Sequence, residues 1–376
     1  MSDGTDQTPA GPLNGGAVPV AEPGRIVISV DAMGGDRGPG AVVAGIAKAA
    51  KANPDIAFLL HGPADQLTRA VSRRKMLRDR CEIRDCGGVV TMEDKPSQVM
   101  RHGKGTSMWS CLESVRDGEA KVAVSCGNTG ALMALSMVRL RKIPGVNRPA
   151  IAVLWPSRNP SGFNVMLDVG ADVRADEEDL LQYALMGASY ARNGMHIDRP
   201  RIGLLNVGTE ENKGRAELKA AHDLIEAEAP GGKFDFVGFV EGGDIPGDRC
   251  DVIVTDGFTG NVALKTGEGT AKLIGDLLKE AFKFSPLSRI AALLALTSMR
   301  RLQKRIDPRR VNGGVFLGLN GTVVKSHGSA DATGVEAAVN LAFQLARQDL
   351  TSKIKARVAS AGAAEQDAPE ETKVAE

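Results

Sequence analysis

The fold of this chain is decided by a motif at residues 122–132, Val122-Ala-Val-Ser-Cys-Gly-Asn-Thr-Gly-Ala-Leu132. Its first four residues are small or β-branched, which predicts a short strand buried on both faces. A polar turn with two glycines follows, and residues 130–140 have the pattern of a helix. A strand, a glycine-containing turn and a helix in this order form one unit of an α/β fold.

Similar units recur along the chain. Apolar, mostly β-branched runs predict strands at residues 25–30, 56–60, 165–168, 202–206, 236–240 and 252–255, with a helix over residues 42–52. Strands that are apolar throughout indicate a largely parallel sheet between two layers of helices, a three-layer α/β/α fold. We expect one catalytic domain at residues 25–356. Disordered tails are expected at residues 1–24 and 357–376, which have no apolar periodicity.

Composition excludes several classes of protein. The net charge of +1 over 376 residues gives no reason to expect nucleic-acid binding. The five cysteines form no C-x-x-C pair, which indicates reduced thiols rather than disulfides or zinc ligands. Residues 1–24 contain no Lys or Arg, so no signal peptide is expected. We therefore expect a cytoplasmic protein without a metal or cofactor.

Polar turns that contain glycine follow most of the predicted strands. They lie at residues 31–36, 125–130, 168–172, 206–208 and 256–261. In open α/β sheets, ligands bind beyond the carboxyl ends of the strands. The turns are therefore predicted to form one continuous polar rim along a single edge of the sheet.

Two of these turns could hold an anion. Residues 127–130 and 257–261 lie between a strand and a helix, where backbone N–H groups favour a phosphate, although a plain βα turn has the same composition. No Walker motif or dinucleotide motif is present, which argues against ATP and NAD. Three lysines, Lys213, Lys265 and Lys325, lie near the turns. Lys265 is expected one turn into a helix, where a nearby anion or simple solvation would each explain a cation.

No nucleophile stands out. There is no G-x-S-x-G motif, and Cys126 is interpreted as a buried thiol. His327 follows Lys325, and it could be a core residue or a ligand contact.

Five motifs in order along residues 25–350 resemble the bacterial phosphate acyltransferase family called PlsX. They are Asp31-Ala-Met-Gly-Gly-Asp36, Ser125-Cys-Gly-Asn-Thr-Gly-Ala-Leu132, Leu204-Leu-Asn-Val-Gly-Thr-Glu-Glu-Asn-Lys-Gly214, Val254-Thr-Asp-Gly-Phe-Thr-Gly-Asn-Val262 and Val324-Lys-Ser-His-Gly328. The chain departs from the family's usual pattern at Cys126, where Ala is usual, and at Asp172 and Arg174, where Asn and Asp are usual.

The resemblance implies an α/β/α fold similar to phosphotransacetylase and the isocitrate dehydrogenase group, and a homodimer. It implies acyl carrier protein as the acyl donor and inorganic phosphate as the acceptor. The acyl phosphate product would supply a membrane glycerol-3-phosphate acyltransferase (PlsY type) in phospholipid synthesis.

A mechanism can be written on these residues. Phosphate would attack the thioester carbonyl directly, and the site would hold both reactants and stabilise an oxyanion. Lys213 is the first choice to pair with phosphate or the oxyanion. The remaining candidate catalytic residues are Lys265, Lys325, His327, Asn128 and Asn261. The candidate substrate-binding residues are Asp31, Gly34, Gly35, Asp36, Gly127, Thr129, Gly130, Asp168, Gly170, Asn206, Asp256, Gly257, Thr259 and Gly260.

Residues 266–310 predict a helical hairpin, with one helix over residues 267–282 and a second capped by Ser285 and opened by Pro286. The second helix carries apolar Leu287, Ile290, Leu293 and Leu294, followed by basic Arg300, Arg301, Lys304 and Arg305. An apolar stretch beside a basic cluster is typical of an anchor on an anionic membrane surface. A dimerisation hairpin or an acyl carrier protein surface is equally compatible. We expect peripheral association with the inner face of the membrane.

Three other functions are compatible with the sequence. A short-chain phosphotransacetylase and a decarboxylating dehydrogenase share the expected fold. The dehydrogenase lacks support, because neither a metal-binding carboxylate cluster nor a nucleotide loop is found in the sequence. A membrane-surface scaffold without activity is the third possibility.

Overall fold

The computed structural model describes residues 24–210, 213–306 and 313–366. It contains an 11-stranded mixed sheet. In spatial order the strands are β3 (Cys81–Asp85), β2 (Ile56–Gly62), β1 (Ile26–Asp31), β4 (Val122–Ser125), β11 (Thr322–Lys325), β10 (Gly314–Leu317), β5 (Ala150–Pro156), β6 (Phe163–Leu167), β9 (Val252–Val254), β7 (Arg201–Leu205) and β8 (Asp235–Val240). The predicted strands are confirmed within two residues. The sequence analysis missed β3, β5, β10 and β11.

Helices cover both faces of this sheet. One face carries α1 (Gly38–Ala52), α6 (Glu177–Met195), α7 (Ala216–Gly232), α10 (Ala332–Arg347) and α11 (Leu350–Gln366). The other carries α3 (Pro96–His102), α4 (Ser107–Arg116), α5 (Thr129–Arg139) and the first part of α8 (Gly257–Lys283). The short helix α2 (Ala64–Ser72) lies beside β3.

Side chains of one strand alternate between the two cores, as the pleat requires. Val122 and Val124 pack into one core, and Ala123 packs into the other. The three-layer α/β/α prediction is confirmed.

Strand direction reverses across the centre of the sheet. The pairs β11–β10, β10–β5 and β5–β6 are antiparallel, and the remaining strand pairs are parallel. Three reversals make β6, β9 and β7 run opposite to β1, β4 and β11. The carboxyl ends of these two groups therefore lie at opposite edges of the sheet.

The prediction of one continuous polar rim is therefore wrong. Residues 31–36 and 125–130 lie at one edge, here called the first edge, together with the turn after Lys325. Residues 168–172, 206–208 and 256–261 lie at the other, the second edge. The error arises because β10 and β5, which were not predicted, form the antiparallel pairs at which the strand direction reverses.

Helix α8 connects the two edges. It begins at the second edge, where the Asp256 side chain accepts a hydrogen bond from the Thr259 N–H at 2.8 Å. It then contacts β6, and Gly267 packs on Trp155 near the carboxyl end of β5, at the first edge. A Cβ on Gly267 would lie 2.5 Å from the Trp155 ring, so a larger residue here would displace that ring.

The helix starts ten residues earlier than predicted, because the several glycines of its first turns conceal the helical pattern. Lys265 is thus the ninth residue of the helix that begins at Gly257. Lys265 therefore lies beyond the first turn, to which the electrostatic effect of the helix dipole is confined.

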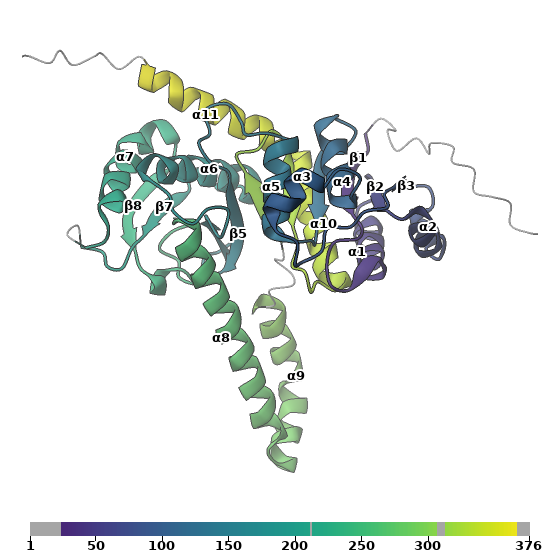
Figure 1. Ribbon diagram of the computed structural model, residues 1–376. Helices are drawn as coiled ribbons and strands as arrows, with labels where there is room; N and C mark the ends of the chain where they lie inside the picture. Colours follow the sequence, from purple (N-terminus) through teal and green to yellow (C-terminus); the bar gives the residue numbers. More distant parts are fainter. Residues whose placement is uncertain (1–23, 211–212, 307–312, 367–376) are drawn as a thin grey trace, which may run out of the picture.

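Beyond the sheet, α8 and α9 (Pro286–Ile306) project together from the body as a helical hairpin (Figure 1). Ser285 caps α9 as predicted, with its Oγ accepting from the Ser288 N–H at 3.0 Å. Among the described residues, no helix has the length and apolar character needed to cross a membrane.

Helix α11 extends past the predicted boundary at residue 356, to Gln366. Val358 packs into the core and Arg357 forms an ion pair with Glu228 at 3.1 Å. The remaining predicted tail segments, residues 1–23 and 367–376, lie outside the described residues.

Candidate active site

At the first edge, Asp31 organises the turns after β1 and β4. Its carboxylate accepts hydrogen bonds from the Ser107 and Ser125 hydroxyls, both at 2.7 Å. The Ser125 oxygen in turn accepts the Gly127 N–H at 3.0 Å. Burial raises the pKa of Asp31, and the two serine hydrogen bonds only partly oppose this effect. Asp31, predicted to bind substrate, is buried and holds the Gly127 turn in place through Ser125.

Glycines let the three turns of the first edge meet. A Cβ on Gly34 would lie 2.6 Å from the Gly127 nitrogen. Gly35 has a φ of +96°, and its Cβ would lie 2.9 Å from both the Cys126 Cβ and the Gly328 oxygen. The Asp36 N–H donates to the Gly328 oxygen at 2.8 Å. The glycines predicted as ligand contacts therefore have a packing role.

The side chain of Asn128 is committed within the protein. Its oxygen caps α5 by accepting from the Ala131 N–H at 3.0 Å, and its amide donates to the Met92 oxygen at 2.8 Å. Thr129 and Gly130, the first residues of α5, are exposed. The backbone at the start of α5, rather than the Asn128 amide, thus faces solvent.

Lys325 ends β11 at this edge and is almost buried, with 9% of its surface exposed. Burial, with a smaller contribution from the positive charge of Lys265, lowers its pKa to about 8. Burial raises the pKa of neighbouring Cys126 to about 11, in keeping with an unreactive thiol. His327 is exposed, with its Nδ1 2.9 Å from the Ser329 Oγ.

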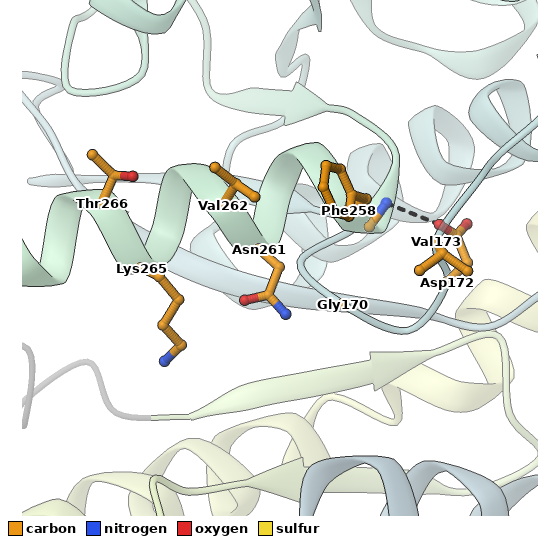
Figure 2. A pocket seen from close by; sticks show the side chains of 9 residues that line it. Gly170, Asp172, Val173, Phe258, Asn261, Val262, Lys265 and Thr266 are labelled. Atoms are coloured by element: carbon orange, nitrogen blue, oxygen red, sulfur yellow. Dashed lines mark hydrogen bonds between the residues drawn. The ribbon is translucent and has the colours of Figure 1, made fainter.

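A cavity of about 570 Å³ lies along α8 (Figure 2). Its lining residues are Gly170, Asp172, Val173, Gly257, Phe258, Asn261, Val262, Lys265 and Thr266. Asn261 and Lys265 point from one flank of the helix, and Phe258, Val262 and Thr266 lie on the other (Figure 2). Four predicted site residues, Gly170, Gly257, Asn261 and Lys265, are thus brought together.

Asp168 anchors the start of α8 from below the cavity. It is fully buried and accepts from the backbone N–H groups of Ile151 at 2.7 Å and Asp172 at 2.9 Å. Burial raises its pKa to about 6 despite these hydrogen bonds. A Cβ on Gly260 would lie 1.9 Å from the Asp168 carbonyl oxygen, so α8 rests directly on this backbone. Asp168 and Gly260 therefore position the helix.

The two departures from the family pattern have different environments. Asp172 accepts from the Gly257 N–H at 2.9 Å and from the Tyr183 hydroxyl at 2.5 Å. It therefore fixes the first residue of α8. Arg174 is exposed and pairs with Glu217 at 2.7 Å, away from the cavity lining.

The other predicted residues of the second edge have partners of their own. Lys213 is half exposed and pairs with Glu210 at 2.7 Å. Asn206 donates to the Lys213 carbonyl oxygen at 3.2 Å. Asp256 is held by Arg215 and Thr259; burial opposes its ionisation, but their hydrogen bonds outweigh it and lower the pKa of Asp256. Lys213 therefore lies at the edge opposite to Lys325.

Sequence reasoning missed the apolar members of the cavity. Phe258 and Val262 are four residues apart, which places them on one face of a helix. The four-residue spacing is visible in the sequence, but it indicates a shared helix face only once α8 is known to begin at Gly257.

The second predicted surface is present on the hairpin. The exposed fractions of Leu287, Ile290, Leu293 and Leu294 are 76%, 55%, 70% and 84%. Arg301 is exposed as well. Arg300, Lys304 and Arg305 belong to α9, and their side chains lie outside the described part of the chain.

The fold and this cavity beside a glycine-rich edge define a protein with a phosphotransacetylase-type architecture. A phosphotransacetylase from Streptococcus pyogenes superposes with a TM-score of 0.56 at 16% identity, over 86% of this chain and 94% of that one. The EutD phosphotransacetylase from Staphylococcus aureus has a TM-score of 0.53 at 14% identity, with the same two coverages of 86% and 94%. At this level of identity the likeness concerns the fold alone.

Sequence similarity is far closer. Residues 26–353 match the family model described as "Fatty acid synthesis protein", and the chain belongs to this family. A protein from Cereibacter sphaeroides named phosphate acyltransferase is 74% identical over 93% of this chain and 95% of its own length. A namesake from Paracoccus denitrificans is 73% identical, over 90% of this chain and 92% of its own. The resemblance to the PlsX phosphate acyltransferases is confirmed.

Proposed function

We propose that the protein transfers a long-chain fatty acyl group from acyl carrier protein to inorganic phosphate. The product is an acyl phosphate that serves phospholipid synthesis. The name shared by its relatives supports the transfer of an acyl group to phosphate. The family description, fatty acid synthesis, supports a fatty acyl chain as the group transferred.

The observation that carries the proposal is the cavity along α8, with Asn261 and Lys265 in its lining (Figure 2). Lys325 ends β11 almost buried, and burial, with a smaller contribution from the charge of Lys265, lowers its pKa. Phosphate bears one to two negative charges near neutral pH, and ammonium groups in a partly desolvated site bind it strongly. Lys265 also pairs with Glu268, at 2.9 Å, but unlike Lys213 it lines the cavity. Lys265 and the almost buried Lys325 therefore replace Lys213 as first choices.

The reaction needs no nucleophile from the protein. A phosphate oxygen attacks the thioester carbonyl carbon, a C–O bond forms, and the C–S bond breaks with its electron pair on sulfur. Backbone N–H groups at the start of α5 and the Asn261 amide stabilise the oxyanion. A lysine whose pKa is about 8 is mostly charged at pH 7, so Lys325 can give a proton to the departing thiolate.

The partners follow from the surface of the hairpin. Its exposed leucines and isoleucine, with Arg301 beside them, suit an anionic membrane, a second copy of the chain or an acidic acyl carrier protein. We propose a homodimer that sits at the inner face of the membrane and delivers acyl phosphate to a glycerol-3-phosphate acyltransferase there.

The first experiment measures release of free thiol from palmitoyl acyl carrier protein with and without phosphate. Phosphate-dependent release, with a product trapped by hydroxylamine, is expected. Lys265→Ala and Lys325→Ala should each lower the rate about 10²–10³-fold, because each removes a charge that faces the transition state. Lys272→Ala, an exposed lysine two turns further along α8, is the matched control and should keep full activity.

Other outcomes identify the alternatives. Release without phosphate would indicate a thioesterase, and no release at all would favour the scaffold. Faster turnover of acetyl-CoA than of the palmitoyl donor would make the protein a short-chain phosphotransacetylase, the alternative that the fold supports.

A further inference from the structure

Helix α8 presents two different rows of side chains to the cavity. Asn261 and Lys265 are four residues apart and form a polar row, and Phe258 and Val262 form an apolar row offset from it. Figure 2 shows the two rows on opposite flanks of the helix. A ligand that lies along this helix thus meets polar groups on one side and hydrocarbon on the other.

The apolar row is exposed to an unusual degree. Phe258 and Val262 are 61% and 51% exposed, and Val173, which faces them from the turn after β6, is 78% exposed. Large apolar side chains that gather in a concave site mark a binding surface. The cavity of about 570 Å³ falls within the usual range for sites of small ligands.

We infer that Phe258 and Val262 bind the methylene groups nearest the thioester, while Asn261 and Lys265 hold the reacting carbonyl and phosphate. This inference rests on the proposed function and adds a determinant of acyl-chain specificity to it. An acyl thioester has a polar end joined directly to a hydrocarbon chain. Both rows line the same cavity, so a ligand that fills it contacts both kinds of side chain.

The cavity offers both polar and apolar contacts to its occupant. Lys265 pairs with Glu268 at 2.9 Å and keeps 57% of its side chain exposed, so its ammonium group is accessible to an anion in the cavity. An acyl donor together with phosphate supplies hydrocarbon to one row and negative charge to the other, whereas a second copy of the chain that covers Phe258 is the alternative that the test separates.

The test uses the full-length protein with acyl carrier protein that carries a palmitoyl or a butyryl group. Phe258→Ala and Val262→Ala should lower kcat/KM for the palmitoyl donor about ten-fold through a higher KM, because hydrocarbon contacts are lost in ground state and transition state alike. The butyryl donor should change less than about two-fold, and Phe258→Leu should restore most of the loss.

Val207→Ala is the matched control, since Val207 is 81% exposed but does not line the cavity. Equal losses for both donors, or no loss for either, would overturn the inference. A change in the molar mass of the Phe258→Ala variant by light scattering, without a change in chain-length preference, would also overturn it. That result would assign Phe258 to an interface between copies of the chain. Wild-type protein that shows no phosphate-dependent release from either donor would overturn the proposed function itself, and the inference with it.

Discussion

The turns after β4 and β9 have similar sequences, but the helices that follow them pack differently. Each joins a buried strand to a helix through glycines, and each helix is capped by a side chain, Asn128 or Asp256. Helix α5 then packs its apolar residues into the core, whereas the described part of α8 leaves the body after crossing the sheet. In the first turn the Asn128 side chain is held within the protein, and only the backbone at the start of α5 is accessible. The second keeps Asn261 and Lys265 open to a ligand.

The difference shows that a glycine-rich turn does not identify a binding residue by itself. Both Asn128 and Asn261 follow a strand and a glycine. The Asn128 amide is held by the Met92 and Asp94 carbonyl oxygens at 2.8 and 3.2 Å, while Asn261 lines the cavity. The surface on which the following helix packs decides which asparagine stays accessible.

The largest expected effect comes from a substitution in the turn after β9. Gly260→Ala places a Cβ against the Asp168 carbonyl, so α8 must shift or detach, and we expect a loss of about 3 kcal/mol in the free energy of unfolding. Gly269→Ala is the matched control on the same helix, where a Cβ meets nothing within 4 Å. It should be neutral or stabilising by up to about 1 kcal/mol. Urea denaturation of both variants measures the difference.

The next effect separates the two asparagines. Asn261→Ala should lower the rate of acyl transfer about 10²-fold, with unfolding unchanged, because it removes a donor that faces the ligand. Asn128→Ala should cost about 1 kcal/mol of stability through loss of the α5 cap. Thiol release and urea denaturation are measured on both. Equal behaviour of the two variants would contradict the contrast drawn between the turns.

The smallest expected effect is a pH dependence of stability that arises from Lys325. Burial lowers the pKa of Lys325 to about 8 from 10.5, so the unfolded chain binds more protons between these values. The cost of burying the charge is fully present below pH 8, and the stability contribution of Lys325 rises as the pH increases from 8 to 10.5.

Lys265→Ala removes the nearby charge that also lowers the pKa of Lys325, and it should move the onset of that rise to higher pH. Unfolding free energies measured between pH 7 and the alkaline limit of the protein, with Lys325→Met as the reference that lacks the rise, test this. An onset that does not move would mean that the two lysines do not interact.

The local part of this fold was predictable, and the long-range part was not. Hydrophobic runs located strands such as β4 to the residue, because burial on both faces leaves a clear pattern. Edge assignment failed because it depends on β10 and β11, which are only four residues long and pair across the chain. The turn motifs suggested an anion site. The place of Lys265 in the cavity depends on where α8 begins and on how it crosses the sheet, which no local pattern encodes.

Helix α8 also has a mechanical consequence. It is one element of 27 residues, about 40 Å long at 1.5 Å per residue, seated at one end on the Asp168 backbone. Counted from Gly260, Lys265 lies about 8 Å from that seat and the end of the helix at Lys283 lies about 35 Å from it. The helix is therefore a lever that pivots at Gly260. A load that moves the tip sideways by about 5 Å moves Lys265 by about 1 Å, a displacement large enough to alter the alignment of reacting groups. A partner that binds the hairpin tip would therefore change the position of Lys265 in the cavity.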